Sequence, residues 1–274
     1  MDVKLIASDG ADLYVEEMGS GTPILFLHEM GGSCRSWAPQ LRHFETSHRC
    51  IVYNARGYPP STVPQDYRNY SQEIAARDAL AVLDALGVER AHIVGLSMGS
   101  FATLKFGLDH PERALSLTVA GCGSGSVLAG YQASQRRYEA MAKSIEDGGF
   151  AAFVEGYVRG PARQALLRRN PDSWNEFAEG MRQASPVGLA CTLRGVQARR
   201  PSLWHLEERL AAMKLATLLI CGDQDEPCLQ PNLFLNRVLP DSRLFVFGDC
   251  GHAVNHDEPA LFNRTLRDFI EHHE

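Results

Sequence analysis

The chain has 274 residues, of which 45% are apolar and 22% are charged, and this composition is ordinary for a soluble enzyme-sized protein. Its net charge of −6 argues against a nucleic-acid partner, because proteins that bind nucleic acids present a basic patch or stripe. Five arginines do recur in the second half of the chain, and we expect them to lie on a solvated helix face: Arg163, Arg168, Arg169, Arg199 and Arg200.

The cysteine pattern and the N-terminal residues indicate the cellular compartment. The seven cysteines are an odd number without a Cys-x-x-Cys pair, which indicates free thiols in a reducing compartment. Residues 1–5 hold no basic segment followed by an apolar run, so we expect no secretory signal, and no apolar run approaches the length that spans a bilayer. We therefore expect a cytoplasmic protein that does not contact membranes.

Eight short strands are predicted. Residues 3–18 alternate in polarity around an Asp-Gly turn at positions 9 and 10, which predicts a hairpin of two antiparallel strands. Uniformly apolar runs that indicate burial on both faces follow at 24–27, 50–53, 91–94, 114–120, 216–221 and 244–247. Such strands predict a mostly parallel sheet covered by helices.

Helical patterns alternate with these strands. One apolar stripe runs from Ser71, a predicted N-cap, to Gly87, which ends it. A second helix is predicted over 98–110, where Pro111 stops it, and a third over 259–270. This alternation is typical of a doubly wound α/β fold.

The alternation is interrupted between about residues 123 and 205. Helical patterns occur there near 131–147, 149–158, 172–184 and 187–199, without a convincing strand. The segment opens on the carboxyl side of a predicted strand, where open α/β sheets bind ligands. We therefore predict an α/β core formed by 1–122 and 206–274, with 123–205 inserted as a helical cap.

Residues 93–99 have the sequence Ile-Val-Gly-Leu-Ser-Met-Gly, which indicates a serine nucleophile. A buried strand, a Gly-x-Ser-x-Gly turn and a helix together are typical of a nucleophile elbow, which exposes the serine at the end of the strand. Gly95 and Gly99 fit because strand and helix approach too closely there for side chains. Ser97 is the predicted nucleophile.

A serine nucleophile needs a base, and the base needs an acid that orients it. Asp225, in the turn after the strand at 216–221, is the predicted acid. Asp223 in the same turn is the competing candidate for this role, but it is better placed to hydrogen-bond the turn itself. His252 follows the last strand in a Gly-His turn and is the predicted base. His256 lies where a loop leads into a helix and is expected to be structural or at the surface. A metal pair with His252 is not favoured, because it lacks the His-Glu-x-x-His pattern and a third candidate.

Acyl transfer also needs two donors for the oxyanion. The backbone N–H of Met98, directly after the nucleophile, is one predicted donor. The loop after the strand at 24–27 should supply the other, and we assign the N–H of Met30.

In these motifs the sequence resembles the α/β-hydrolase superfamily, in particular its capped esterase and C–C-hydrolase-like branch. The matching segments span nearly the whole chain outside the cap, in the expected order: His28 with Gly31-Gly32, residues 53–57, 95–99 and 222–225, and Gly251-His252. The resemblance implies a mostly parallel eight-stranded sheet flanked by helices, with a Ser-His-Asp triad and neither metal nor other cofactor.

The oxyanion loop departs from this resemblance. The superfamily has His-Gly at its start, whereas this chain has His28-Glu29. Glu29 either orients a ligand, bonds within its own loop or points away, and we favour a local structural role while keeping it among the substrate-binding candidates. The other candidates for substrate binding are His28 and Trp204. With Trp204, five further aromatics of the cap are expected to supply an apolar pocket: Phe150, Phe153, Tyr157, Trp174 and Phe177.

The predicted function is hydrolysis of a small or medium carboxylic ester, with a small-molecule acyl substrate as the partner. A C–C bond, lactone or amide hydrolase with the same triad is the alternative. A ligand sensor on a hydrolase scaffold is a third hypothesis, and a homodimer is left open.

Overall fold

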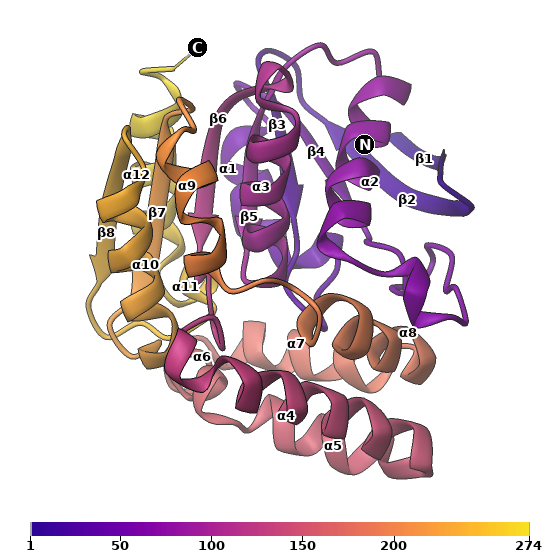
Figure 1. Cartoon of the computed structure of the whole chain (residues 1–274). Helices are drawn as coiled ribbons and strands as arrows, with labels where there is room; N and C mark the ends of the chain where they lie inside the picture. The colour runs from indigo at the N-terminus through magenta and orange to yellow at the C-terminus, as the bar shows by residue number, and fades with distance from the viewer. Residues whose placement is uncertain (1, 274) are drawn as a thin grey trace.

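The computed structural model describes residues 2–273 and has an eight-stranded sheet as its centre (Figure 1). The strands are β1 Asp2–Ser8, β2 Ala11–Met18, β3 Pro23–Leu27, β4 Arg49–Tyr53, β5 Ala91–Leu96, β6 Ala114–Ala120, β7 Thr217–Gly222 and β8 Ser242–Phe247. Their order across the sheet is β1-β2-β4-β3-β5-β6-β7-β8. Only the β1/β2 and β2/β4 pairs are antiparallel, so the predicted mostly parallel α/β sheet is confirmed.

The structure agrees with the predicted hairpin of β1 and β2 but not with the predicted burial of β8. Asp9 and Gly10 both have positive φ, at 42° and 77°, as a two-residue hairpin turn requires. The prediction that 244–247 is buried on both faces is wrong, because β8 is an edge strand. Phe245 and Val246 are 44% and 47% exposed there.

Helices cover both faces of the sheet. The α-helices are α1 Ala38–Phe44, α2 Gln72–Ala85, α3 Met98–Asp109, α4 Tyr131–Ser144, α5 Phe150–Val158, α6 Gln164–Arg169, α7 Pro171–Arg182, α8 Pro186–Cys191, α9 Glu207–Ala211, α10 Glu226–Val238, α11 Val254–Asp257 and α12 Pro259–Ile270. One apolar core packs α2, α3 and α10 on one face, and a second packs α1 and α12 on the other. Within the described residues, no helix combines the length and apolar character needed to cross a membrane.

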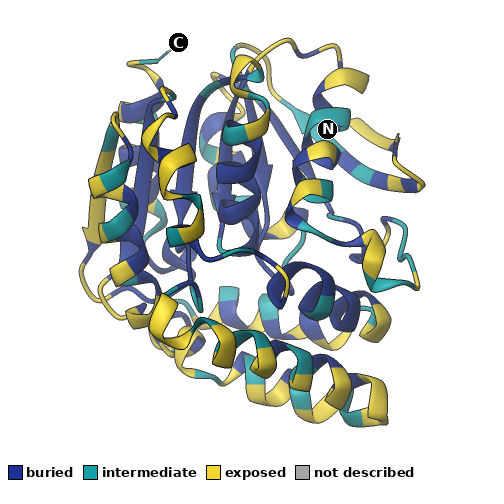
Figure 2. Ribbon diagram, viewed as in Figure 1, coloured by how far each residue is buried: buried dark blue, intermediate teal, exposed yellow. Residues whose placement is uncertain are grey.

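Between β6 and β7 the described chain contains helices and turns but no strand. In Figure 1 helices α4 to α8 form a layer beyond one end of the sheet, with α4 and α5 farthest from it. A third apolar cluster joins this layer to the core, since Tyr138 and Leu189 of the layer belong to the same cluster as Met30 and Met98. Figure 2 shows the outer surfaces of α4 and α5 largely exposed. The domain boundaries at 123 and 205 stay a prediction.

Candidate active site

Ser97 occupies a strained turn between β5 and α3. Its φ is 54° and its ψ is −109°, values that non-glycine residues rarely adopt. A Cβ on Gly95 would clash with the carbonyl of Gly99, and a Cβ on Gly99 would clash with the carbonyl of Leu27. Both glycines are therefore required by close backbone contacts, and the turn leaves the Ser97 side chain at the carboxyl end of β5.

A hydrogen-bonded chain of three side chains extends from Ser97. Its Oγ lies 2.7 Å from Nε2 of His252, and Nδ1 of His252 lies 2.8 Å from Oδ2 of Asp225. Asp225 follows β7 and His252 follows β8, so both lie at the carboxyl ends of the parallel strands, as Ser97 does at the end of β5. The structure thus brings the three predicted residues together in the geometry of a nucleophile, a base and an orienting acid.

Burial and charge fix the ionisation of Asp225, which is 2% exposed. Burial alone would raise the pKa of this carboxyl, but the adjacent His252 ring, together with a contact from Cys228, holds the pKa below its usual value. Asp225 is therefore a carboxylate at neutral pH, and it can stabilise a positive charge that forms on His252.

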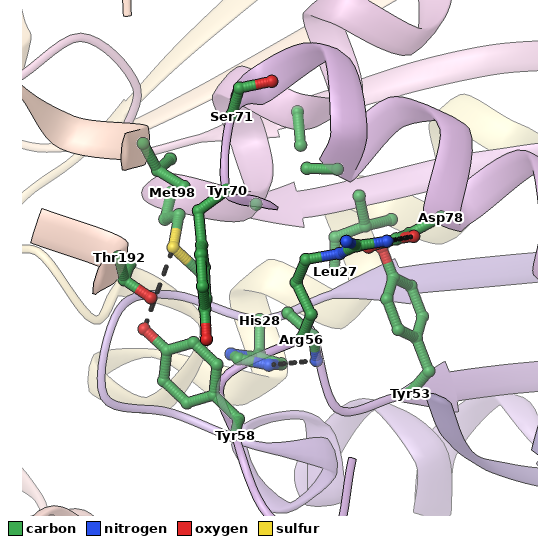
Figure 3. Close-up of a pocket in the computed structure, with 15 residues that line it drawn as sticks. Leu27, His28, Tyr53, Arg56, Tyr58, Tyr70, Ser71, Asp78, Met98 and Thr192 are labelled. Carbon is green, nitrogen blue, oxygen red and sulfur yellow. Dashed lines mark hydrogen bonds and ion pairs between the residues drawn. The ribbon is translucent and has the colours of Figure 1, made fainter. Parts of the chain in front are cut away.

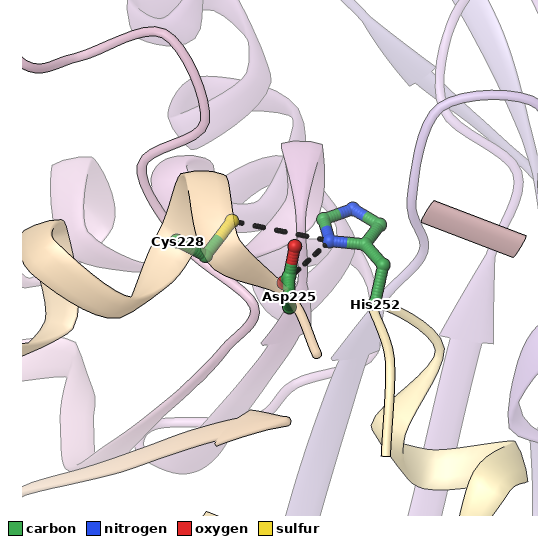
Figure 4. Close-up of side chains that lie close together, drawn as sticks. All are labelled: Asp225, Cys228 and His252. Carbon is green, nitrogen blue, oxygen red and sulfur yellow. Dashed lines mark hydrogen bonds and ion pairs between the residues drawn. The ribbon is translucent and has the colours of Figure 1, made fainter. Parts of the chain in front are cut away.

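Cys228 is a further neighbour of His252, and the sequence analysis did not name it as a site residue. Figure 4 shows Cys228 and Asp225 facing the same ring nitrogen of His252, and the thiol sulfur lies 3.9 Å from that Nδ1. Burial raises the pKa of this thiol well above its usual value. Although these three residues have metal-ligating atoms within 4.8 Å of one another, both His252 nitrogens already face Oγ and carboxylate partners, so the cluster fits acid–base chemistry better than a metal.

The two competing residues have other roles. Asp223 accepts a hydrogen bond from the backbone N–H of Cys250 at 3.1 Å, so it bonds the turn. His256 is buried, with Nε2 2.8 Å from the carbonyl of Ser36 and Nδ1 3.1 Å from the Ser173 hydroxyl. Neither side chain lines the cavity at Ser97.

One predicted oxyanion donor follows the nucleophile directly, and the other lies in the wall of the same cavity. Met98 begins α3, so its N–H belongs to the first turn, where helical N–H groups lack partners within the helix. Met30 lines the same cavity as Ser97, in a loop where Gly31 has a φ of 80°. Their assignment as an oxyanion hole stays a proposal.

His28 does not reach this cavity, which corrects its assignment to substrate binding. Its Nδ1 lies 2.7 Å from the Glu29 carbonyl, and its Nε2 accepts a hydrogen bond from the Ala55 N–H at 3.0 Å. Figure 3 shows the ring beside Tyr58 and Arg56 in a separate cavity of about 40 Å³. Because both ring nitrogens bind backbone, His28 holds two loops together.

Glu29 also points away from Ser97, so its assignment to substrate binding is corrected as well. Its carboxylate is buried and lies 3.8 Å from the guanidinium of Arg163, in a cavity of about 70 Å³ that Ser97 does not line. Arg163 is 1% exposed and lies 3.9 Å from the centroid of the Phe177 ring. The local structural role that the sequence favoured for Glu29 therefore includes a contact with the helical layer.

Trp204 is the third corrected substrate-binding candidate. Its ring stacks on Phe234 of α10 at a centroid distance of 4.2 Å, and it packs against the apolar core under α3 and α10. It lines none of the cavity at Ser97. Its apolar area is used for packing, which is the usual fate of a tryptophan between helices.

The cavity at Ser97 has a volume of about 640 Å³, enough for a small or medium ligand. Of the five other aromatics predicted to supply an apolar pocket, Phe153 and Tyr157 line it. Trp174 instead packs within the layer and donates from its indole N–H to the Val158 carbonyl at 2.8 Å.

Several polar cavity residues were not predicted as site residues, and three of them carry a guanidinium or an amide. Arg137 of α4 and the pair Gln197 and Arg200 line the wall of the helical layer. The expectation of a solvated arginine face is wrong for Arg163 and Arg200, which are both buried. Gln197 ends the helical segment Thr192–Gln197 and Arg200 follows it in a bend, so helix periodicity gave no signal that both residues line this cavity.

Comparisons with known proteins agree with the fold. Residues 22–259 match the family model described as the alpha/beta hydrolase fold. The 2-hydroxy-6-oxo-6-phenylhexa-2,4-dienoate hydrolase of Comamonas testosteroni is 27% identical, with 94% of this chain and 91% of that protein covered.

Two solved structures resemble the whole chain. One, described as an N-acyl homoserine lactone degrading enzyme, is 26% identical with a TM-score of 0.79, and covers 97% of this chain and 100% of its own. A thermophilic esterase from Thermogutta terrifontis is 22% identical with a TM-score of 0.88 over 100% of both chains, and supports the fold alone. With the sheet, the elbow and the family match in place, this chain belongs to the α/β hydrolase family.

Proposed function

We propose that this chain is a serine hydrolase that cleaves a small or medium carboxylic ester through an acyl-enzyme. The observation that carries the proposal is the continuous hydrogen-bonded chain from Ser97 through His252 to Asp225, which opens on the 640 Å³ cavity.

In the first step the Ser97 oxygen attacks the ester carbonyl carbon while His252 takes the hydroxyl proton. The N–H groups of Met30 and Met98 bind the oxyanion, and the Asp225 carboxylate stabilises the imidazolium. The tetrahedral intermediate then collapses, the bond to the leaving alcohol breaks, and His252 gives its proton to that oxygen.

In the second step water attacks the acyl carbon, with His252 again accepting a proton. The bond between the acyl carbon and Ser97 breaks, the serine oxygen is reprotonated, and the carboxylic acid leaves. Ester hydrolysis thus consumes one water, and the triad ends as it began.

A second candidate is hydrolysis of a lactone, C–C bond or amide by the same triad. It is favoured by similarity to the lactone-degrading enzyme and the dienoate hydrolase, both over 94% or more of this chain. A ligand sensor is the candidate from another class. The cytoplasmic location and a homodimer stay predictions, with seven buried free thiols supporting a reducing compartment.

The test is turnover of p-nitrophenyl acetate and butyrate, a set of lactones and a ring-fission dienone by wild type and by Ser97→Ala. We expect many turnovers of an ester per enzyme, and a fall in kcat of about 10⁴-fold or more in Ser97→Ala without a change in the urea midpoint. Ser242→Ala, on the edge strand, serves as the matched control.

Activity of Ser97→Ala within tenfold of wild type would refute the triad mechanism. Turnover of the dienone with negligible turnover of esters would replace the first candidate by the second. Product that never exceeds the enzyme concentration would favour the sensor.

A further inference from the structure

Arg200 is a buried cation that faces the cavity. It is 7% exposed, and its guanidinium carbon lies 5.4 Å from the Phe101 ring centroid and 5.8 Å from that of Tyr138. It donates a hydrogen bond to the carbonyl of Ser124. Across residues 2–273, no carboxylate lies within ion-pair distance of it. A buried charge is costly unless it is paired, so this guanidinium is suited to an anion brought by a ligand.

Gln197 lies three residues before Arg200, at the end of the helical segment Thr192–Gln197, and lines the same cavity. It is 6% exposed, and its amide makes no hydrogen bond to another residue in the described part of the chain. Because both residues line the same cavity, the Gln197 amide can offer a further donor to a ligand there. Arg137, from α4, brings a second cation to the cavity and lies 5.2 Å from the ring centroid of Tyr138.

The charged side chains that line the cavity are mostly basic. Asp225 is the single acidic residue among the described residues that line it, and its carboxylate is held by His252. The cavity wall is thus cationic in a chain whose net charge is −6. Apolar contacts come from the other cap residues of the lining, among them Phe153 and Met141.

We propose that the natural substrate carries a carboxylate separate from its scissile carbonyl, and that Arg200 and Gln197 bind it, with Arg137 as a second cation. This inference rests on the proposed hydrolytic function and names its substrate class. A carboxylate suits the site because its two oxygens match the planar fork of a guanidinium. The scissile carbonyl then lies at Ser97, and the substrate is a small hemi-ester or a lactone acid.

The experiment compares kcat/KM for mono-p-nitrophenyl glutarate, which is anionic, with that for neutral p-nitrophenyl hexanoate. We expect wild type to prefer the anionic ester by at least tenfold. In Arg200→Gln this preference falls by about 10- to 100-fold, because hydrogen bonds between charged groups are lost. Arg200→Lys keeps the charge but loses the fork, so it restores only part of the preference.

Arg199→Gln is the matched control. It removes the same charge one residue away, from an exposed side chain that pairs with Glu139 and does not line the cavity. We expect its preference to stay within about twofold of wild type, as for a surface charge. An equal loss in both variants would mean a general charge effect and would overturn the assignment to Arg200.

Failure of this inference can be told from failure of the proposed function. Equal turnover of both esters, with no change of ratio in Arg200→Gln, overturns the inference and leaves hydrolysis standing. If wild type hydrolyses neither ester, calorimetry of glutarate binding to Ser97→Ala still tests the anion site. Binding that is lost on adding Arg200→Gln supports it, no binding overturns it, and equal binding of inorganic phosphate overturns the choice of a carboxylate.

Discussion

Arg163 and Arg200 are both buried between the helical layer and the core, yet they meet different partners. Arg163 faces a carboxylate of the core, Glu29, across 3.8 Å. Arg200 faces a backbone carbonyl, aromatic rings and the cavity. Both are fixed cations, because arginine does not lose its proton in proteins.

This difference separates a structural cation from one available for binding. Arg163 lies within ion-pair distance of Glu29, in the loop that carries Met30, so we infer that this pair holds the helical layer against that loop. Arg200 donates to the Ser124 carbonyl but lies within ion-pair distance of no acidic side chain in residues 2–273, so we propose that a ligand supplies its anion.

The largest expected effect comes from breaking the Arg163 pair. Arg163→Met should lower the free energy of unfolding by about 3 kcal/mol, because it leaves the Glu29 carboxylate buried without a partner. Glu29→Gln should cost a similar amount. The double variant should cost at least about 1 kcal/mol less than the sum, as for coupled neighbours, and urea denaturation measures all three.

Arg199→Gln again provides the control, with an expected change within about 0.5 kcal/mol. Strict additivity of the two single variants would show that Arg163 and Glu29 are not coupled. The contrast between a structural and a binding arginine would then be lost.

A smaller effect comes from a buried basic group that, unlike arginine, can give up its proton. His92 in β5 is fully buried, with Nδ1 2.7 Å from the Ser116 hydroxyl, and burial lowers its pKa to about 3. The unfolded chain binds a proton at this histidine below pH 6.5, whereas the folded chain does not. The free energy of unfolding should therefore be unaffected by His92 above pH 6.5 and fall as the pH drops from there toward 3.

His92→Asn removes this titration and keeps a polar group toward Ser116. Between pH 7.5 and 5.5, wild type should lose about 1.4 kcal/mol more stability than this variant. Parallel pH curves for the two proteins would contradict the prediction, and they would mean that His92 takes up a proton in the folded state.

Sequence predicted the sheet and placed the triad candidates well, for local reasons. Apolar runs mark parallel strands, and loops after such strands end at one edge of the sheet, so Ser97, Asp225 and His252 had to lie near one another. The exposure of β8 was harder to predict, because Phe245 and Val246 are apolar like the residues of a buried strand although β8 lies at the lateral edge of the sheet.

The roles of residues that contact the helical layer could not be predicted from local sequence patterns. The direction of Glu29 depends on Arg163, which lies 134 positions later, and the role of Arg200 depends on α3, α4 and the loop after β6. Helix periodicity identifies a face but not its partner. Trp204 was assigned to the cavity for its aromatic ring, whereas Phe234 supplies the surface on which it stacks.

The central claim is that Ser97 is an activated nucleophile, and covalent trapping tests it most directly. A fluorophosphonate should transfer one phosphonyl group to the enzyme with loss of fluoride, and peptide mass spectrometry should find it on Ser97. Ser97→Ala should stay unlabelled. A folded wild-type protein that remains unlabelled, or that carries the group on another residue, would contradict the account.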